Sequence, residues 1–168
     1  MSLIKKGEEL CGDRVETVRF EDSTTLVLAD GLGSGVKANI LSTLTSKIIA
    51  TMMASGMPVE ECVRTVTRTL PICKVRKVAY STFTIIRIAG NRREAEIIQY
   101  DNPHVILLRD GKNYDYEKTA MEIGGKTIYK SKIKLQENDT FITTSDGAIH
   151  AALDIFEEAA ELYGLPPH

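Results

Sequence analysis

Hydrophobic residues first gather in a short run that is typical of a buried strand. The segment TTLVLA, from Thr24 to Ala29, is apolar and β-branched, and it lies between an acidic turn and a glycine-rich stretch. A shorter strand is predicted before it, over Val15 to Phe20. We therefore expect two neighbouring strands at the start of the fold.

The hydrophobic pattern then changes to a helical period. Apolar residues recur every three or four positions from Val36 onward, until Gly56 and Pro58 stop them. The residues of this period are Ile40, Leu41, Leu44, Ile48, Ile49, Met52 and Met53. A second helical period begins at Val59 and ends near Pro71. The sequence predicts a long amphipathic helix of roughly 30 Å, followed by a second helix that completes a hairpin.

Strand signals fill residues 80–135, where apolar runs alternate with short turns. The turns are centred on Gly90-Asn91, Asn102-Pro103, Asp110-Gly111 and Gly124-Gly125. Connections this short favour antiparallel pairing, because a parallel crossover needs about a dozen residues or more. Another strand is predicted over Thr140 to Thr144, and an alanine-rich helix over 151–163. The fold class expected is α+β, with an antiparallel sheet and helices packed on it.

Length and composition fit one ordinary globular domain. The chain has 168 residues, of which 43% are hydrophobic and 26% charged. A chain of this size buries roughly 70% of its unfolded surface, so it needs no disulfide or metal to form a core. The formal charge is −2 and no segment concentrates Lys and Arg, which argues against a nucleic-acid groove.

The cysteines and the apolar runs indicate a cytoplasmic protein. The three cysteines form no CxxC pair, which is typical of reduced thiols. The N-terminus has no apolar run that would suit a signal peptide, and no run approaches the roughly 20 residues of a membrane span. We expect no membrane contact within this chain.

Two Asp-Gly pairs each close a predicted strand and precede a predicted helix. They are Asp30-Gly31 and Asp146-Gly147. An aspartate in this position can cap the helix N-terminus or carry a function, and the pattern alone leaves both readings open. A third pair, Asp110-Gly111, lies between two short strand runs and is most simply a hairpin turn.

The glycine-rich stretch after Asp30 favours the functional reading. Gly31, Gly33 and Gly35 alternate, which permits positive φ angles and a close approach of the backbone. A carbonyl such as that of Gly31 could then point at a cation. A phosphate cradle is the alternative, although the spacing matches neither common nucleotide-binding motif. Upstream, Asp13 adds a carboxylate just before the first predicted strand.

In this order, these motifs resemble those of the PP2C-type metal-dependent protein phosphatases, in the bacterial branch typified by the stage II sporulation protein E phosphatase domain. The matching segments are Gly12-Asp13, residues 28–35, the helix hairpin, Ser81-Thr82-Phe83, residues 101–104 and Thr144 to Gly147. The resemblance extends from about residue 6 to residue 163. It implies an αββα sandwich of antiparallel sheets with flanking helices, as a single domain over residues 1–168. The family's last strand, which carries an Asp-Asp or Asp-Asn pair, is expected to be missing.

The same resemblance implies a site for two divalent cations, Mn²⁺ or Mg²⁺. Asp30 would bridge both ions, Asp13 and the carbonyl of Gly31 would bind one of them, and Asp146 would bind the other. Oxygen ligands suit these hard cations. Two dications and three carboxylates leave a local charge of +1, which attracts a phosphoryl dianion. Asp13, Asp30 and Asp146 would thus be the catalytic residues.

The function implied is hydrolysis of phosphoserine or phosphothreonine in a bacterial regulatory phosphoprotein, by attack of a metal-bridging hydroxide. The type case of the substrate is an anti-sigma-factor antagonist, in sporulation or a stress response. The helix hairpin over 34–70 would be the contact for a regulatory domain or a second copy. Because the last aspartate is missing, one alternative is a non-catalytic domain that binds a phosphoprotein or a regulatory partner. Another is an anion or nucleotide binder that uses the loop from Gly31 to Gly35.

Three further residues attract weaker hypotheses. His104 and His150 could serve as a general acid, but surface or capping roles fit their positions better. Arg14 follows Asp13 directly, so along a strand its side chain is expected to point to the opposite face.

Overall fold

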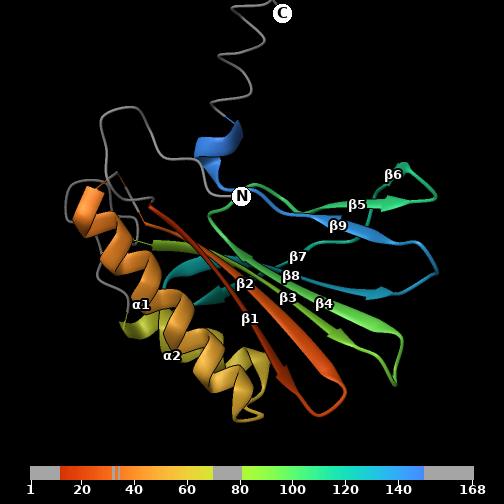
Figure 1. Ribbon diagram of the computed structural model, residues 1–168, viewed down its shortest axis with the longest axis horizontal. Coiled ribbons are helices and arrows are strands. Elements are labelled where there is room, and N and C mark those ends of the chain that lie inside the picture. The colour runs from red at the N-terminus through yellow and green to blue at the C-terminus, as the bar shows by residue number, and fades with distance from the viewer. Residues whose placement is uncertain (1–11, 32, 34, 70–80, 150–168) are drawn as a thin grey trace, which may run out of the picture.

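The computed structural model describes residues 12–31, 33, 35–69 and 81–149. Three layers succeed one another: a pair of helices, a large antiparallel sheet and a smaller sheet (Figure 1). The prediction of one domain over 1–168 stays a prediction, since residues 150–168 lie outside the described part.

The large sheet has six strands in the order β1-β2-β3-β4-β8-β7, and every neighbouring pair is antiparallel. Their bounds are β1 Asp13–Phe20, β2 Ser23–Gly31, β3 Ser81–Ala89, β4 Glu94–Tyr100, β7 Thr119–Ile123 and β8 Lys126–Lys134. The small sheet has the order β6-β5-β9, with β5 Ile106–Arg109, β6 Lys112–Tyr114 and β9 Thr140–Ile142. The antiparallel α+β fold predicted from the sequence is confirmed. The strand expected over Thr140 to Thr144 ends two residues earlier.

The two helices cover one face of the large sheet. Helix α1 spans Gly35–Ala54 and helix α2 spans Val59–Thr69. A turn with Gly56 at a φ of 79° connects them, and this left-handed conformation suits glycine. Side chains from both helices and from alternate positions of the central strands form the first hydrophobic core, which includes Val27, Ile49, Val63, Phe83, Ile85 and Ile98.

The opposite face of the large sheet packs against the small sheet. Ile86 and Ile97 come from the large sheet, and Leu107 and Phe141 come from the small one. Tyr116 joins them from the segment between β6 and β7, and its hydroxyl donates a 2.5 Å hydrogen bond to the carbonyl of Val105. The large sheet is therefore apolar on both faces, which explains the long hydrophobic runs in β3 and β4.

The prediction of which α1 residues face the core is wrong in part. Ile40 and Leu44 were expected to be buried, but they are 57% and 53% exposed. The buried face is instead made largely of small residues, namely Ala38, Ser42, Thr45, Ser46 and Ala50, together with Ile49 and Met53. Small side chains let α1 lie close to the strands beneath it. The serine hydroxyls donate to carbonyls three residues earlier in the helix, which satisfies them without a partner in the sheet.

The fourth, helical layer of the expected αββα sandwich would include the helix predicted over 151–163, which lies outside the described residues. Neither of the described helices, α1 and α2, combines the length and the hydrophobicity that a transmembrane helix requires.

Candidate functional site

Asp13 and Asp30 lie together because of the register between β1 and β2. They are direct partners at the open end of this ladder, and Thr82 of β3 is the next partner along the same row. Cross-strand partners point to the same face of a sheet, with Cβ atoms about 4.5–5.5 Å apart. Two carboxyl groups separated by 17 positions in the sequence are thereby placed side by side on the face away from the helices.

Gly31 follows Asp30 at a place where no side chain fits. A Cβ on Gly31 would lie 2.0 Å from the carbonyl oxygen of Ala38, in the first turns of α1. The N–H of Gly31 donates a 3.0 Å hydrogen bond to the carbonyl of Gly12, which closes the end of the ladder next to Asp13. The glycine therefore allows α1 to begin directly against the strand that carries Asp30.

Asp146 reaches the same place from the other end of the chain. It opens a helical turn over 146–149, shortly after β9 leaves the small sheet. The preceding residue, Ser145, is only 5% exposed. Its hydroxyl donates a 2.6 Å hydrogen bond to Oδ2 of Asp13, which is 132 positions away in the sequence. This contact brings the end of the second sheet to the first strand.

The electrostatics of Asp30 show that the three carboxyl groups converge. Burial, above all, raises the pKa of Asp30 to about 8, and hydrogen bonds with Asp146 and Asp13 and the charges of both raise it further toward that value. A hydrogen bond between two carboxyl groups requires a proton on one of them. Asp30 therefore keeps its proton at neutral pH while no cation is bound.

Asp101 is a fourth acidic residue near this site, and it was not among the residues predicted to bind metal or to act in catalysis. It lies in the turn after β4 with a φ of 51°, a left-handed conformation that Asp tolerates better than most residues. Burial raises its pKa, and the charge of Asp146 contributes in the same direction. The Asp-Asn-Pro sequence indicated a turn, but nothing local indicated that this turn would end near Asp146.

Asn102 fixes this turn to β3. Its Oδ1 accepts a 2.5 Å hydrogen bond from the hydroxyl of Thr82, and its Nδ2 donates to the hydroxyl of Thr84 at 3.2 Å. Because Thr82 is the register partner of Asp30, the turn with Asp101 is tied to the same row of the sheet.

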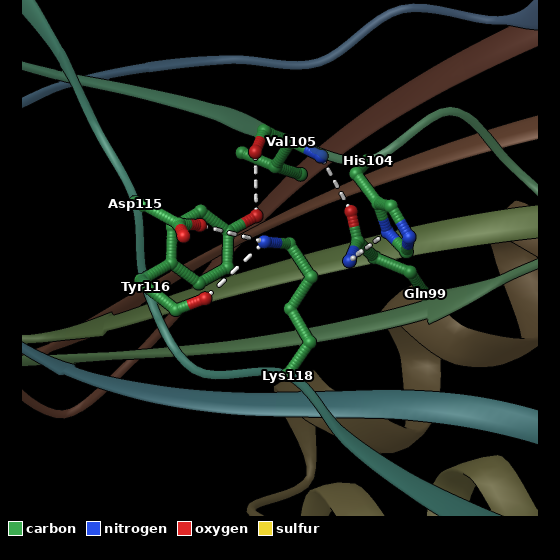
Figure 2. Close-up of polar contacts among 6 residues, drawn as sticks. All are labelled: Gln99, His104, Val105, Asp115, Tyr116 and Lys118. Carbon is green, nitrogen blue, oxygen red and sulfur yellow. Dashed lines mark hydrogen bonds and ion pairs between the residues drawn. The ribbon is translucent and has the colours of Figure 1, made fainter.

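His104 belongs to a neighbouring polar cluster shown in Figure 2. Oε1 of Gln99 accepts the N–H of Val105 at 2.5 Å, so the amide nitrogen of Gln99 donates to Nδ1 of His104 at 3.2 Å. This arrangement assigns the ring proton to Nε2. Burial lowers the pKa of His104, and the charge of Lys118 adds to this effect. The lowered pKa favours the neutral imidazole, and the surface or capping role expected for His104 stays a prediction.

Arg14 points away from the carboxyl groups, as expected. It forms a 3.6 Å ion pair with Glu16, which also binds Lys47 of α1 on the helical side of the sheet. His150 lies outside the described residues.

The chemistry of the donor set fits a hard divalent cation. Three carboxylates and a nearby backbone carbonyl are all-oxygen donors, which Mg²⁺ and Mn²⁺ prefer. Over the described ranges, no three His, Cys, Asp or Glu side chains have the spacing of ligands around one ion. The three carboxyl groups are nevertheless close enough for Asp146 and Asp13 to help raise the pKa of Asp30, after burial, and a bound cation would offset their charges. The ligand roles of Asp13, Asp30, Gly31 and Asp146 stay predictions.

Comparison with known families gives a match over most of the chain. Residues 21–166 match the family model of stage II sporulation protein E, abbreviated SpoIIE. No curated protein sequence matches the chain significantly.

Solved structures of PP2C-type domains share the fold. The PP2C phosphatase domain of SpoIIE from Bacillus subtilis, with a fragment of its regulatory domain, has a TM-score of 0.73 and 18% identity, over 84% of this chain and 42% of that one. RsbX in complex with magnesium has a TM-score of 0.67 and 23% identity, over 88% of this chain and 72% of that one. The RsbU and RsbW domains of a Mycobacterium tuberculosis protein have a TM-score of 0.70 and 18% identity, over 84% of this chain and 41% of that one. The match thus spans less than half of the Bacillus subtilis SpoIIE chain.

Proposed function

Because the chain belongs to the stage II sporulation protein E family and has the fold of PP2C phosphatase domains, we propose that it is a metal-dependent protein phosphatase. The observation that carries this proposal is the meeting of Asp13, Asp30 and Asp146, which come from β1, β2 and the turn after β9. Burial, together with the neighbouring Asp146 and Asp13, raises the pKa of Asp30 to about 8, so the ionised form of Asp30 is disfavoured unless a cation is bound.

Asp13, Asp30, Asp146 and the carbonyl of Gly31 would hold two divalent cations, Mn²⁺ or Mg²⁺. Bound there, the cations would supply a nucleophilic water at neutral pH and offset the charge of the phosphoryl group. The chain's own part is to bring the carboxylates together and keep them oriented. The structure of RsbX, which shares the fold, is a magnesium complex, and this supports the choice of metal.

The substrate proposed is a bacterial regulatory protein phosphorylated on serine or threonine, such as an anti-sigma-factor antagonist, in the cytoplasm. Asp146 is exposed, while Asp13 and Asp30 are half-buried. A site open on one side suits a phosphorylated side chain that is presented on the surface of another protein. The relation to RsbX and to the RsbU and RsbW domains favours a signalling role in sporulation or stress response.

Regulation through the helix hairpin over 34–70 is part of the same proposal. The outer face of α1 presents Val36, Ile40 and Leu44, which are 63%, 57% and 53% exposed and recur every four residues. Because the carbonyl of Ala38 lies against Gly31, a shift of α1 would also displace the end of the strand that carries Asp30. A regulatory domain or a second copy of the chain is the proposed partner of this face.

The alternative is a non-catalytic domain that binds a phosphoprotein or a regulatory partner. It is favoured by one observation: within the described residues, no three side chains have the spacing of ligands around one ion.

One experiment separates the two functions. Phosphate release from a phosphoserine peptide is measured with the full chain, with and without Mn²⁺, beside an Asp30→Asn variant. A phosphatase releases phosphate in a manganese-dependent manner, and the variant does not. Equal background rates in both proteins would contradict catalysis and leave the binding function.

A further inference from the structure

Ser145 makes an unusual contact for a residue between a strand and a helical turn. Its side chain is almost fully buried, at 5% exposure, and its hydroxyl donates a hydrogen bond to a carboxylate at the far end of the sequence. The 2.6 Å distance to Oδ2 of Asp13 is in the range of strong O–H···O⁻ hydrogen bonds. A serine whose role was limited to the local turn would not require a hydrogen bond to Asp13.

The turn at 145–146 is tied to the first two strands at two points. Ser145 contacts Asp13 of β1, and the adjacent Asp146 lies close enough to Asp30 of β2 to help raise its pKa. Asp13 and Asp30 are in turn direct register partners. The hydrogen bond from Ser145 therefore joins the segment after β9 to the pair of strands that carries both of these carboxyl groups.

The hydroxyl of Ser145 is a donor that suits the carboxylate of Asp13 with or without a bound cation. Because neighbouring carboxylates repel one another, this hydrogen bond opposes the separation of the acidic residues.

We propose that Ser145 is a positioning residue for the acidic site: its hydroxyl fixes Asp13 and holds Asp146 near the first two strands, so that less rearrangement is needed to bring these ligands around a divalent cation. This inference rests on the proposed function, because it concerns the metal ions that the phosphatase reaction would use. Removal of a group that only orients a ligand typically weakens metal binding about 10- to 100-fold.

The test is direct binding of Mn²⁺ to the full chain, followed by the electron paramagnetic resonance signal of free Mn²⁺, without any substrate. Ser145→Ala is expected to weaken binding about tenfold or more. Ser145→Thr keeps the hydroxyl and is expected to bind within about threefold of the unaltered chain. The matched control is Ser131→Ala. Ser131 is also buried, at 4% exposure, its hydroxyl has no hydrogen-bond partner among the residues that the structure describes, and it lies in β8 away from the carboxyl groups.

Folding is followed by the melting temperature of each protein in chelator. If Ser145→Ala does not fold, Ser145→Cys keeps the volume of the side chain with a poor hydrogen-bond donor, and the same loss of Mn²⁺ binding is expected of it. Equal Mn²⁺ affinity in the unaltered chain and in a folded alanine or cysteine variant would overturn the proposal. So would a folded threonine variant that binds as weakly as alanine.

The outcome for Ser145 can be distinguished from the outcome for the proposed function. A chain that binds Mn²⁺ in a Ser145-dependent manner but releases no phosphate would support the positioning role and contradict catalysis. A chain that releases phosphate but binds Mn²⁺ equally well without the hydroxyl would contradict only the role of Ser145. A chain that does not bind Mn²⁺ at all would overturn both.

Discussion

Asp13 and Asp30 face each other across the open end of the β1–β2 ladder. Like charges in directly opposite positions destabilise a sheet, so this pair weakens the fold when both side chains are ionised and no cation lies between them. Asp146 adds a third carboxyl group at the same point. The site therefore links stability to metal binding, and this link makes the function testable without knowledge of the substrate.

Asp30→Asn is expected to stabilise the metal-free protein while it removes activity. The amide keeps the shape of the side chain but cannot ionise, so the variant should gain about 1 kcal/mol or more in the free energy of unfolding at pH 8.5. The stabilisation of the unaltered chain by Mn²⁺ should be lost. The measurements are urea unfolding in chelator and thermal unfolding with added Mn²⁺. Asp110→Asn is the control, because Asp110 lies in an exposed hairpin turn and its substitution should change neither.

The stability of the metal-free protein should fall as the pH rises. The pKa of Asp30 is raised from 3.8 to about 8 in the folded state. Between these values the unfolded chain has released the proton that the folded chain keeps, so the free energy of unfolding decreases with pH and levels off above about 8. Melting temperatures in chelator at pH 6 and pH 8.5 test this slope. An equally steep slope in Asp30→Asn would assign the effect to another group.

The pattern of the sequence predicted most of the elements because their signals are local. The hydrophobic runs of β2 to β4, the hairpin turn at Asp110-Gly111 and the stop of α1 near Gly56 each depend on a few adjacent residues. Positive φ angles of 51° and 73° at Asp110 and Gly111 are those of the tight hairpin expected there.

The structural features that the sequence did not predict depend on contacts between elements that are distant in the sequence. The period of α1 favoured burial of Ile40 and Leu44, but α1 lies so close to the sheet that Ser42 and Ser46 are buried instead. The proximity of Asp101 to Asp146 and the hydrogen bond from Ser145 to Asp13 join distant segments, and no local pattern encodes them. The resemblance to PP2C phosphatases selected Asp13, Asp30 and Asp146, and composition alone could not have done so.

Gly31→Ala should damage the site through the backbone. The added Cβ would lie 2.0 Å from the carbonyl oxygen of Ala38, and a backbone atom cannot move aside without a shift of α1. We expect a loss of about 3 kcal/mol or more in the free energy of unfolding, together with weaker Mn²⁺ binding. Gly147→Ala is the matched control for stability, because a Cβ there meets nothing within 4 Å. Similar urea midpoints for the two variants would contradict this account.

Lys130 of β8 should be important for the attachment of α2 to the sheet. Its ammonium group pairs with Glu60 of α2 and, at 2.8 Å, with Glu96 of β4. The hydrogen bond from Lys130 is the main cause that lowers the pKa of Glu60. Lys130→Met leaves two carboxylates without their cation and should lower the free energy of unfolding by about 1–2 kcal/mol.

The coupling between Lys130 and Glu60 is measured by a double-mutant cycle with Glu60→Gln in urea. The effect of Lys130→Met should shrink when Glu60 is already neutral, and also as the pH falls through the lowered pKa of Glu60, where the carboxylate gains its proton. Strictly additive single effects at neutral pH would show that the two side chains do not stabilise each other.

The last prediction concerns the outer face of α1. It tests whether this face binds a partner or contributes only to the stability of the fold. Leu44 is 53% exposed and Ile49 is fully buried in the same helix. Leu44→Lys should change the free energy of unfolding by less than about 0.5 kcal/mol, whereas Ile49→Lys should prevent stable folding. Ile48 would be a less sharp choice, because it is partly buried against the first core.

If the face with Val36, Ile40 and Leu44 binds a second copy, sedimentation velocity should show self-association of the unaltered chain that Leu44→Lys abolishes. If it binds a regulatory domain, the isolated chain stays monomeric, and the longer protein with that domain attached should lose its regulation in the variant. Either contact would bury the ammonium group of the new lysine. The free energy needed to desolvate this charge is larger than the stabilisation that one exposed hydrogen bond could provide. A Leu44→Lys protein that keeps both its self-association and its regulation would exclude this face as the contact.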